Sequence, residues 1–241
     1  MVAPNDKPVW EAPMTDLDRR SILAGATLLA AASAASAANA QAPAAQTYTP
    51  RPIGFDPKVI AGLSEKLLQS HYDNNYVGAV TRLGAINRQL AQTDMATAPN
   101  FTLNGIKREE MLATNSMILH EYYFASFAPG ASQPGAALAQ RMESDFGSMD
   151  KWRAEFIAMG RAIGGGWVLL TYSPRRGRLV NQWASDHSNT IADGAVIVAM
   201  DMYEHAYALD YGAKAADYVT AYMAALKWSA ADKFFASATR A

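Results

Sequence analysis

The stretch Asp201-Met202-Tyr203-Glu204-His205-Ala206-Tyr207 places an aspartate four residues before a histidine. The preceding run, Ala195-Val196-Ile197-Val198-Ala199-Met200, is apolar throughout and typical of a buried strand. Asp201 is therefore expected at the carboxyl end of that strand. A turn or helix start after it would bring Asp201 and His205 to one face. A carboxylate and an imidazole at one point are suitable ligands for a metal ion.

The chain of 241 residues contains four histidines, and two of the others lie inside helix-like stretches. These are His71 and His120. Three neutral imidazoles and one carboxylate are a complete ligand set for a redox-active iron or manganese ion. We therefore predict one metal site with His71, His120, Asp201 and His205 as ligands. Taken one at a time, each could instead be a core histidine or a helix cap, so the prediction depends on their convergence.

The composition excludes several kinds of site. The chain has no cysteine, which rules out disulfides, thiolate metal sites and cysteine nucleophiles. The formal net charge is −1, without the basic excess of a nucleic-acid-binding surface, so no nucleic-acid partner is expected. Half of the residues are hydrophobic, which is enough for a substantial core.

Residues 1–40 have the order of an export signal. Arg19-Arg20 precede a moderately apolar, alanine-rich run, and Ala38-Asn39-Ala40 fits a cleavage site before Gln41. The paired arginines resemble a twin-arginine signal, which predicts a periplasmic protein without membrane attachment after cleavage. Either Met1 or Met14 could be the start. An alanine-rich tail and an uncleaved leader anchoring an interaction domain are the alternatives.

The remaining chain divides into three predicted parts. Residues 41–57 are rich in proline and form an extended arm. Residues 58–130 form an antiparallel hairpin of two long helices, one starting near Ser64 and running past residue 90, the other running from near Ile106 through Phe124. Because each helix carries one histidine, both imidazoles could point to one spot.

Residues 136–241 form a C-terminal α/β domain with a small three-stranded antiparallel sheet. Helical patterns at 136–146 and 149–162 precede a β-hairpin over 167–172 and 179–183, and the strand 195–200 completes the sheet. A single helix over 213–237 is expected to close the chain. The fold class predicted for the whole chain is α+β.

These residues together resemble the iron/manganese superoxide dismutase family. The family has D-x-W-E-H-A-Y where this chain has 201–207, and G-S-G-W where it has Gly164-Gly165-Gly166-Trp167. His71 and His120 match the first two family ligands in order and spacing. The resemblance implies one iron or manganese ion per subunit, superoxide as substrate, and dioxygen and hydrogen peroxide as products.

The resemblance also implies roles around the metal. His187 falls where manganese-type members usually place a glutamine that hydrogen-bonds the metal-bound solvent, and the small Ser116 leaves room for this contact; an exposed loop histidine is the alternative. Trp167 and Tyr203 belong to an aromatic cage. Glu204 matches a glutamate that reaches across a dimer interface, which implies a homodimer.

The entrance to the site departs from the family. Asn75 and Ala79 stand where a histidine and a tyrosine are usual, and Ala208 replaces a second tyrosine; Tyr76 could serve only with a local shift. A catalytically weak or inactive relative of the same fold is therefore the main alternative. A two-histidine-one-carboxylate oxygenase is another. The sequence leaves open iron or manganese, dimer or tetramer, and the turnover rate.

Overall fold

The computed structural model describes residues 46–189 and 192–240. The predicted export signal, residues 1–40, lies outside the described residues. The described residues all belong to one compact unit, Ala42–Ala241.

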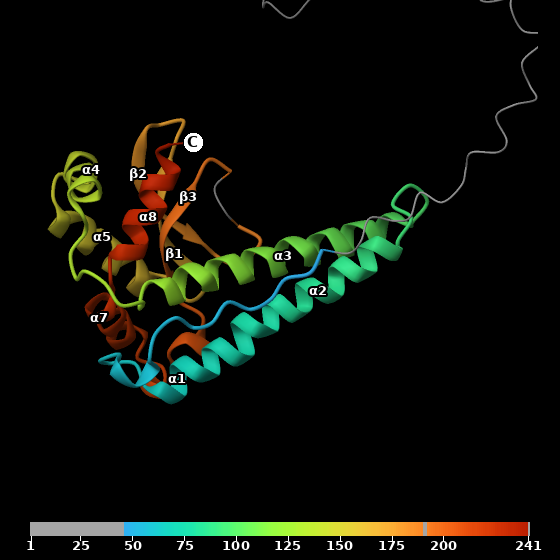
Figure 1. The fold of residues 1–241 in the computed structure, drawn as a ribbon, viewed down its shortest axis with the longest axis horizontal. Coiled ribbons are helices and arrows are strands. Elements are labelled where there is room, and N and C mark those ends of the chain that lie inside the picture. The colour runs from blue at the N-terminus through green and yellow to red at the C-terminus, as the bar shows by residue number, and fades with distance from the viewer. Residues whose placement is uncertain (1–45, 190–191, 241) are drawn as a thin grey trace, which may run out of the picture. The chain divides into compact units, whose positions relative to one another are not determined.

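Two long helical runs form the predicted antiparallel hairpin, seen as the teal and green helices of Figure 1. The first comprises α1 (Glu65–Ser70), the π-helix η2 (His71–Tyr76) and α2 (Val77–Gln92). The second is α3 (Asn100–Ala125). It begins earlier than the predicted start near Ile106, because the carbonyl of Pro99 accepts the first amide hydrogen bonds of the helix.

The C-terminal part contains the predicted three-stranded antiparallel sheet, in the order β2-β1-β3. The strands are β1 (Trp167–Ser173), β2 (Arg178–Ala184) and β3 (Ala195–Asp201). Helices α4 (Ala136–Phe146) and α5 (Met149–Ala162) precede them. Trp167 begins the central strand and pairs with Asp201 at the end of β3. This register sets the carboxylate beside the indole.

The prediction of one closing helix over 213–237 is wrong. The segment forms α7 (Ala215–Ala225) and α8 (Ser229–Ala238), after the short elements η3 (Glu204–Ala206) and α6 (Ala208–Tyr211). Between α7 and α8 the backbone turns to the loop after α3: the amide of Lys227 donates to the carbonyl of Ser126 at 2.7 Å, and that of Trp228 to Ala131 at 2.8 Å. These tertiary hydrogen bonds outweigh the helix propensity of the segment.

The segment 46–56, part of the predicted arm, has no helix or strand and leads into the 3-10 helix η1 (Pro57–Val59). It runs along the helical hairpin in Figure 1. The Phe55 ring packs on Phe124 and Phe127 near the end of α3, which ties the arm to the core. None of the described helices is long and apolar enough to cross a membrane.

Candidate metal centre

The four predicted ligands come from four different elements and meet at one point. His71 is the first residue of η2, His120 lies on α3, Asp201 ends β3, and His205 lies in η3. One nitrogen of each imidazole and one carboxylate oxygen all lie within 4.8 Å of one another. The convergence on which the sequence prediction depended is therefore present.

The spacing of these atoms fits a single ion. Oδ2 of Asp201 is 3.1 Å from Nε2 of His71, 3.1 Å from Nε2 of His205 and 3.5 Å from Nε2 of His120. Metal–nitrogen bonds to histidine are about 2.1 Å long, so ligand atoms around one ion lie about 3.0–3.4 Å apart.

Backbone groups fix the outer atoms of two ligands. Nδ1 of His120 donates to the carbonyl of Ser116 at 2.6 Å, which leaves the lone pair on the buried Nε2; that atom has no hydrogen-bond partner among the described residues. The other carboxylate oxygen of Asp201, Oδ1, accepts from the amide of Tyr203 at 2.8 Å. The free electron pairs thus point to the shared centre.

Burial sets the charge of the site. It lowers the pKa of His120 to about 3, and it lowers the pKa of His71 in spite of the nearby carboxylate. Burial raises the pKa of Asp201, but hydrogen bonds from His205 and His71 outweigh it, so the pKa lies below its usual value. An ionised carboxylate among neutral imidazoles is the charge state that a cation requires.

The glycine run before β1 holds the end of β3 in place. Gly166 has φ +80°, and a Cβ there would meet the carbonyl oxygen of Ala184 at 2.1 Å. The carbonyl of Gly166 accepts from the amide of Met202 at 2.8 Å. From the other side, the hydroxyl of Tyr218 donates to the carbonyl of Asp201 at 2.7 Å. The ligand carboxylate therefore leaves a backbone fixed on both sides.

Aromatic rings surround the ligands. The rings of Trp167 and His120 are 5.2 Å apart, edge to face, and Tyr203 stacks on His205 at 5.4 Å. Phe124 packs on His71 at 5.2 Å. Trp167 and Tyr203, the residues predicted for an aromatic cage, therefore lie beside the ligands His120 and His205.

Two comparisons with known proteins agree with this geometry. Residues 134–234 match the model of the C-terminal domain of iron/manganese superoxide dismutases. The chain is 62% identical over 195 residues to a superoxide dismutase [Fe] of Cupriavidus metallidurans, covering 80% of this chain and 98% of the relative. The chain belongs to the iron/manganese superoxide dismutase family.

More distant members of the family are also similar. A superoxide dismutase [Fe] of Saccharolobus solfataricus is 31% identical over 179 residues, with 71% of this chain and 84% of the relative covered. A superoxide dismutase [Mn] 2 of Haloferax volcanii is 32% identical over 176 residues, with 69% and 83% covered. Relatives of this chain thus include proteins named for either metal.

His187 lies beside the ligands, as the family resemblance implied. Its ring is 5.0 Å from that of Tyr203 and 6.1 Å from that of His120. Its Nε2 is buried without a hydrogen-bond partner among the described residues. The side chain of Asn115 donates to the carbonyl of His187 at 2.6 Å. Sequence reasoning missed Asn115, since nothing in the pattern of α3 indicates a contact with that loop.

A cavity of about 400 Å³ leads from the surface to the centre. His120, His187 and His205 line it together with two of the altered entrance residues, Asn75 and Ala79. Asn75 and Ala79, which were assigned to the entrance without the local shift that Tyr76 would need, therefore line the cavity. Tyr76 does not line it: its hydroxyl points to the other side of the hairpin and donates to Glu121 at 3.1 Å.

Arg82 is a further entrance residue that sequence reasoning missed. It lines the cavity and is the only residue with a fixed charge among those described there. Its guanidinium pairs with Glu109 on α3. Burial lowers the pKa of His187, and the positive charge of Arg82 acts in the same direction. Glu204, the residue predicted at a dimer interface, is exposed. Ala208, the third altered entrance residue, is also exposed but is not among the described residues that line the cavity.

Proposed function

We propose that this chain is a superoxide dismutase that uses one iron or manganese ion held by His71, His120, Asp201 and His205. It converts superoxide to dioxygen and hydrogen peroxide. The observation that carries this conclusion is the convergence of three imidazole nitrogens and one carboxylate oxygen in a chain 62% identical to an iron superoxide dismutase.

The bound ion supplies alternate one-electron reduction and oxidation of superoxide. The protein supplies the setting. Neutral His71 and His120 and ionised Asp201 keep the buried negative charge of the ligands to one carboxylate, which limits the cost of burying the ion. Superoxide enters past Asn75 and Ala79, and His187 offers its unpartnered Nε2 for a hydrogen bond beside the ligands.

The test is metal analysis and activity on the same sample. Protein loaded with iron, and separately with manganese, is expected to hold about one ion per chain and to dismute superoxide with at least one of them. Full metal content with only background activity from near neutral to mildly alkaline pH would contradict the proposal. That result would favour an inactive relative of the same fold.

The geometry disfavours the oxygenase alternative. A two-histidine-one-carboxylate site leaves the third histidine outside the ligand set. Here the ligand atoms of His71, His120 and His205 all lie within 4.8 Å of one another and of the Asp201 oxygen.

We propose further that the protein acts as a homodimer. Support comes from Glu204, an exposed acid in the same 3-10 helix as the ligand His205. Light scattering during gel filtration is expected to show a dimer, and Glu204→Ala to shift the protein toward monomer with weaker metal retention. A dimer indifferent to Glu204→Ala, or a monomeric wild type, would contradict this role.

Export by a twin-arginine signal is proposed on the sequence of residues 1–40 alone. Mass spectrometry of the periplasmic protein is expected to find Gln41 at the amino terminus. Replacement of Arg19-Arg20 by Lys-Lys is expected to keep the protein in the cytoplasm with its signal uncleaved. Export that persists in this variant would exclude the twin-arginine route.

A further inference from the structure

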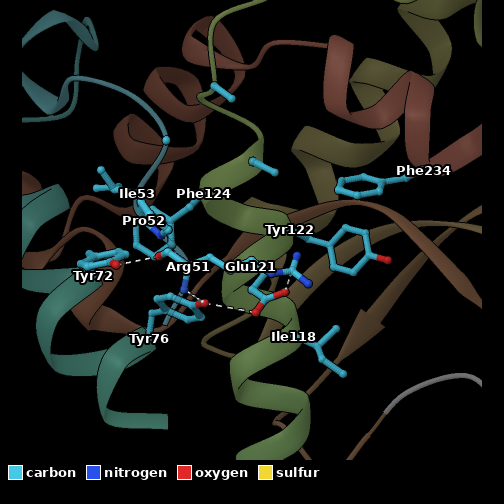
Figure 2. Close-up of a pocket in the computed structure, with 13 residues that line it drawn as sticks. Arg51, Pro52, Ile53, Tyr72, Tyr76, Ile118, Glu121, Tyr122, Phe124 and Phe234 are labelled. Atoms are coloured by element: carbon cyan, nitrogen blue, oxygen red, sulfur yellow. Dashed lines mark hydrogen bonds and ion pairs between the residues drawn. The ribbon is translucent and has the colours of Figure 1, made fainter. Parts of the chain in front are cut away.

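Within the N-terminal arm, the residue Arg51 hydrogen-bonds to the helical hairpin through its backbone. Its amide donates to the hydroxyl of Tyr76 at 2.8 Å, and its carbonyl accepts from the hydroxyl of Tyr72 at 2.7 Å. Figure 2 shows the two tyrosine rings side by side beneath the arm, with both hydroxyls directed at Arg51. Both tyrosines belong to the π-helix η2, whose first residue is the predicted ligand His71.

The side chain of Arg51 reaches the other helix of the hairpin. Its guanidinium is 2.9 Å from Oε2 of Glu121, and the hydroxyl of Tyr76 donates to Oε1 of the same carboxylate. Glu121 directly follows His120 in the chain, as Tyr72 directly follows His71. One residue of the arm therefore bonds to the immediate neighbours of both ligands on the hairpin.

The π-helix η2, to which Arg51 is bonded, depends on contacts from outside the helix for its stability. A π-helix widens the turn and spoils the regular hydrogen-bond ladder, so it is rare and depends on its surroundings. In η2 the side-chain amide of Asn74 donates to the carbonyl of Ser70 at 2.9 Å. Phe124 packs on both His71 and Tyr72, at 5.2 and 5.6 Å. Movement of η2 would therefore displace His71 directly.

We propose that Arg51, through Tyr72, Tyr76 and Glu121, positions the two hairpin histidines for metal binding. The arm acts as a clasp that fixes η2 against α3. This inference rests on the proposed metal site, and it assigns the arm a part in metal retention that nothing in the ligand set itself indicates.

A cavity of about 470 Å³ borders the clasp, and its walls include Arg51, Glu121 and the aromatic rings of Tyr72, Tyr76 and Tyr122. Figure 2 shows the guanidinium at this open side, and 75% of the Arg51 side chain is exposed. Water and salt therefore screen the ion pair, whereas a hydrogen bond between uncharged groups depends little on salt, and the Tyr76 side chain is buried. We expect the two tyrosine hydroxyls to contribute more than the charge pair.

The test compares metal release from iron-loaded protein. Tyr72→Phe and Tyr76→Phe each remove a hydroxyl and keep the ring. The double variant is expected to release iron to a chelator about three- to tenfold faster, which corresponds to the net free energy of about one hydrogen bond reaching the metal site. The electron paramagnetic resonance spectrum of its ferric ion is expected to change in rhombicity, which a general loss of stability would not produce.

Two matched controls stand outside the clasp. Tyr122→Phe removes a hydroxyl from the residue after Glu121, whose ring packs on Phe234. Lys58→Gln breaks the exposed ion pair between η1, which follows the arm, and Glu65. Both are expected to release iron at the wild-type rate. Glu121→Gln gives a second test without a change at the tyrosines, with an expected increase of about twofold that vanishes at high salt.

Wild-type release rates and an unchanged spectrum in the double tyrosine variant would overturn the clasp. So would equal acceleration by Tyr122→Phe. If the double variant fails to fold, an unaltered release rate in Glu121→Gln at low salt overturns it. Failure of the wild-type protein to bind iron or manganese at all would instead refute the proposed function, so the two failures are distinguishable.

Discussion

The inner wall and the entrance of the metal centre are built in different ways. The inner wall consists of His71, His120 and Asp201, which are buried and held by backbone hydrogen bonds and aromatic rings. The entrance consists of side chains such as Asn75 on η2 and Arg82 on α2, which border an open cavity. From the sequence we expect the inner wall to follow the family pattern and the entrance to depart from it.

The difference teaches how a site can change without losing its metal. A ligand side chain that is buried where four elements meet cannot shift alone, because the packing of its neighbours resists the movement. An entrance side chain such as that of Arg82 is exposed and can be exchanged without moving the backbone. We therefore expect inner-wall changes to abolish binding or folding, and entrance changes to adjust rates.

Asp201→Asn should give the largest effect. It removes the charged ligand, so iron affinity is expected to fall by more than about 100-fold, since even outer partners of metal ligands contribute about 10- to 100-fold. Chelator titration and superoxide assays check this. Asp217→Asn, an exposed acid on α7, is the control and should behave as wild type. Retained iron and activity in Asp201→Asn would refute the ligand assignment.

Gly166→Ala tests the backbone behind the inner wall. The added Cβ would meet the Ala184 carbonyl while φ stays positive, so the free energy of unfolding is expected to fall by about 3 kcal/mol or more. Urea unfolding measures it. Gly164→Ala meets nothing within 4 Å and should cost less than about 0.5 kcal/mol. Equal costs at the two positions would contradict the packing described.

Acid should destabilise the metal-free protein through the inner-wall histidines. Burial holds the pKa of His120 near 3 and lowers that of His71, whereas unfolded histidine titrates near 6.5. Below about pH 6.5 the unfolded chain binds more protons, so the free energy of unfolding is expected to fall by up to about 1.4 kcal/mol per pH unit and histidine. Urea unfolding between about pH 7.5 and about pH 5 measures the slope. An unchanged slope in His120→Gln would disprove this origin.

His187→Ala probes the border between the two regions. Loss of the imidazole removes the hydrogen-bonding group beside the ligands, and kcat is expected to fall about tenfold or more with the iron retained. His187→Gln keeps a hydrogen-bonding group and should lose less. Stopped-flow assays and metal analysis check both. Wild-type kcat in His187→Ala would leave only a loop role for this residue.

Arg82→Gln should give the smallest effect, confined to the entrance. A unit charge acting through water over about 10 Å changes the energy of a monovalent anion by about 0.4 kcal/mol, or about twofold in rate. We expect kcat/KM to fall about twofold at low ionic strength and to equal wild type at high salt. Arg88→Gln, on the same helix outside the cavity, is the control. A salt-independent loss would argue against an electrostatic role.

Much of the fold followed from hydrophobic patterns and turn residues. The hairpin, the three strands and the position of Asp201 at a strand end are confirmed. The break between α7 and α8 was not predictable, because the hydrogen bonds of Lys227 and Trp228 go to a loop about a hundred residues earlier in the chain. Hydrophobic periodicity reflects only local contacts, so the pattern of this segment predicted one helix.

The candidate site divides in the same way. Four ligand candidates could be named because the chain has few histidines and one of them follows an aspartate by four residues. Asn115 and Arg82 could not, since an asparagine and an arginine on helices usually face solvent. The π-helix that begins at His71 was also beyond reach, because no residue type in 71–76 specifies a widened turn.

The sequence by itself determined the chemistry: which imidazoles and which carboxylate were present, and which apolar stripes would be buried. Only the tertiary structure decided their relations, namely the separation of the donor atoms, the tautomer of His120 and the docking of Arg51 against η2. The physical reason is range. Residue type and spacing fix local conformation, whereas a metal site and its clasp depend on contacts between segments far apart in the chain.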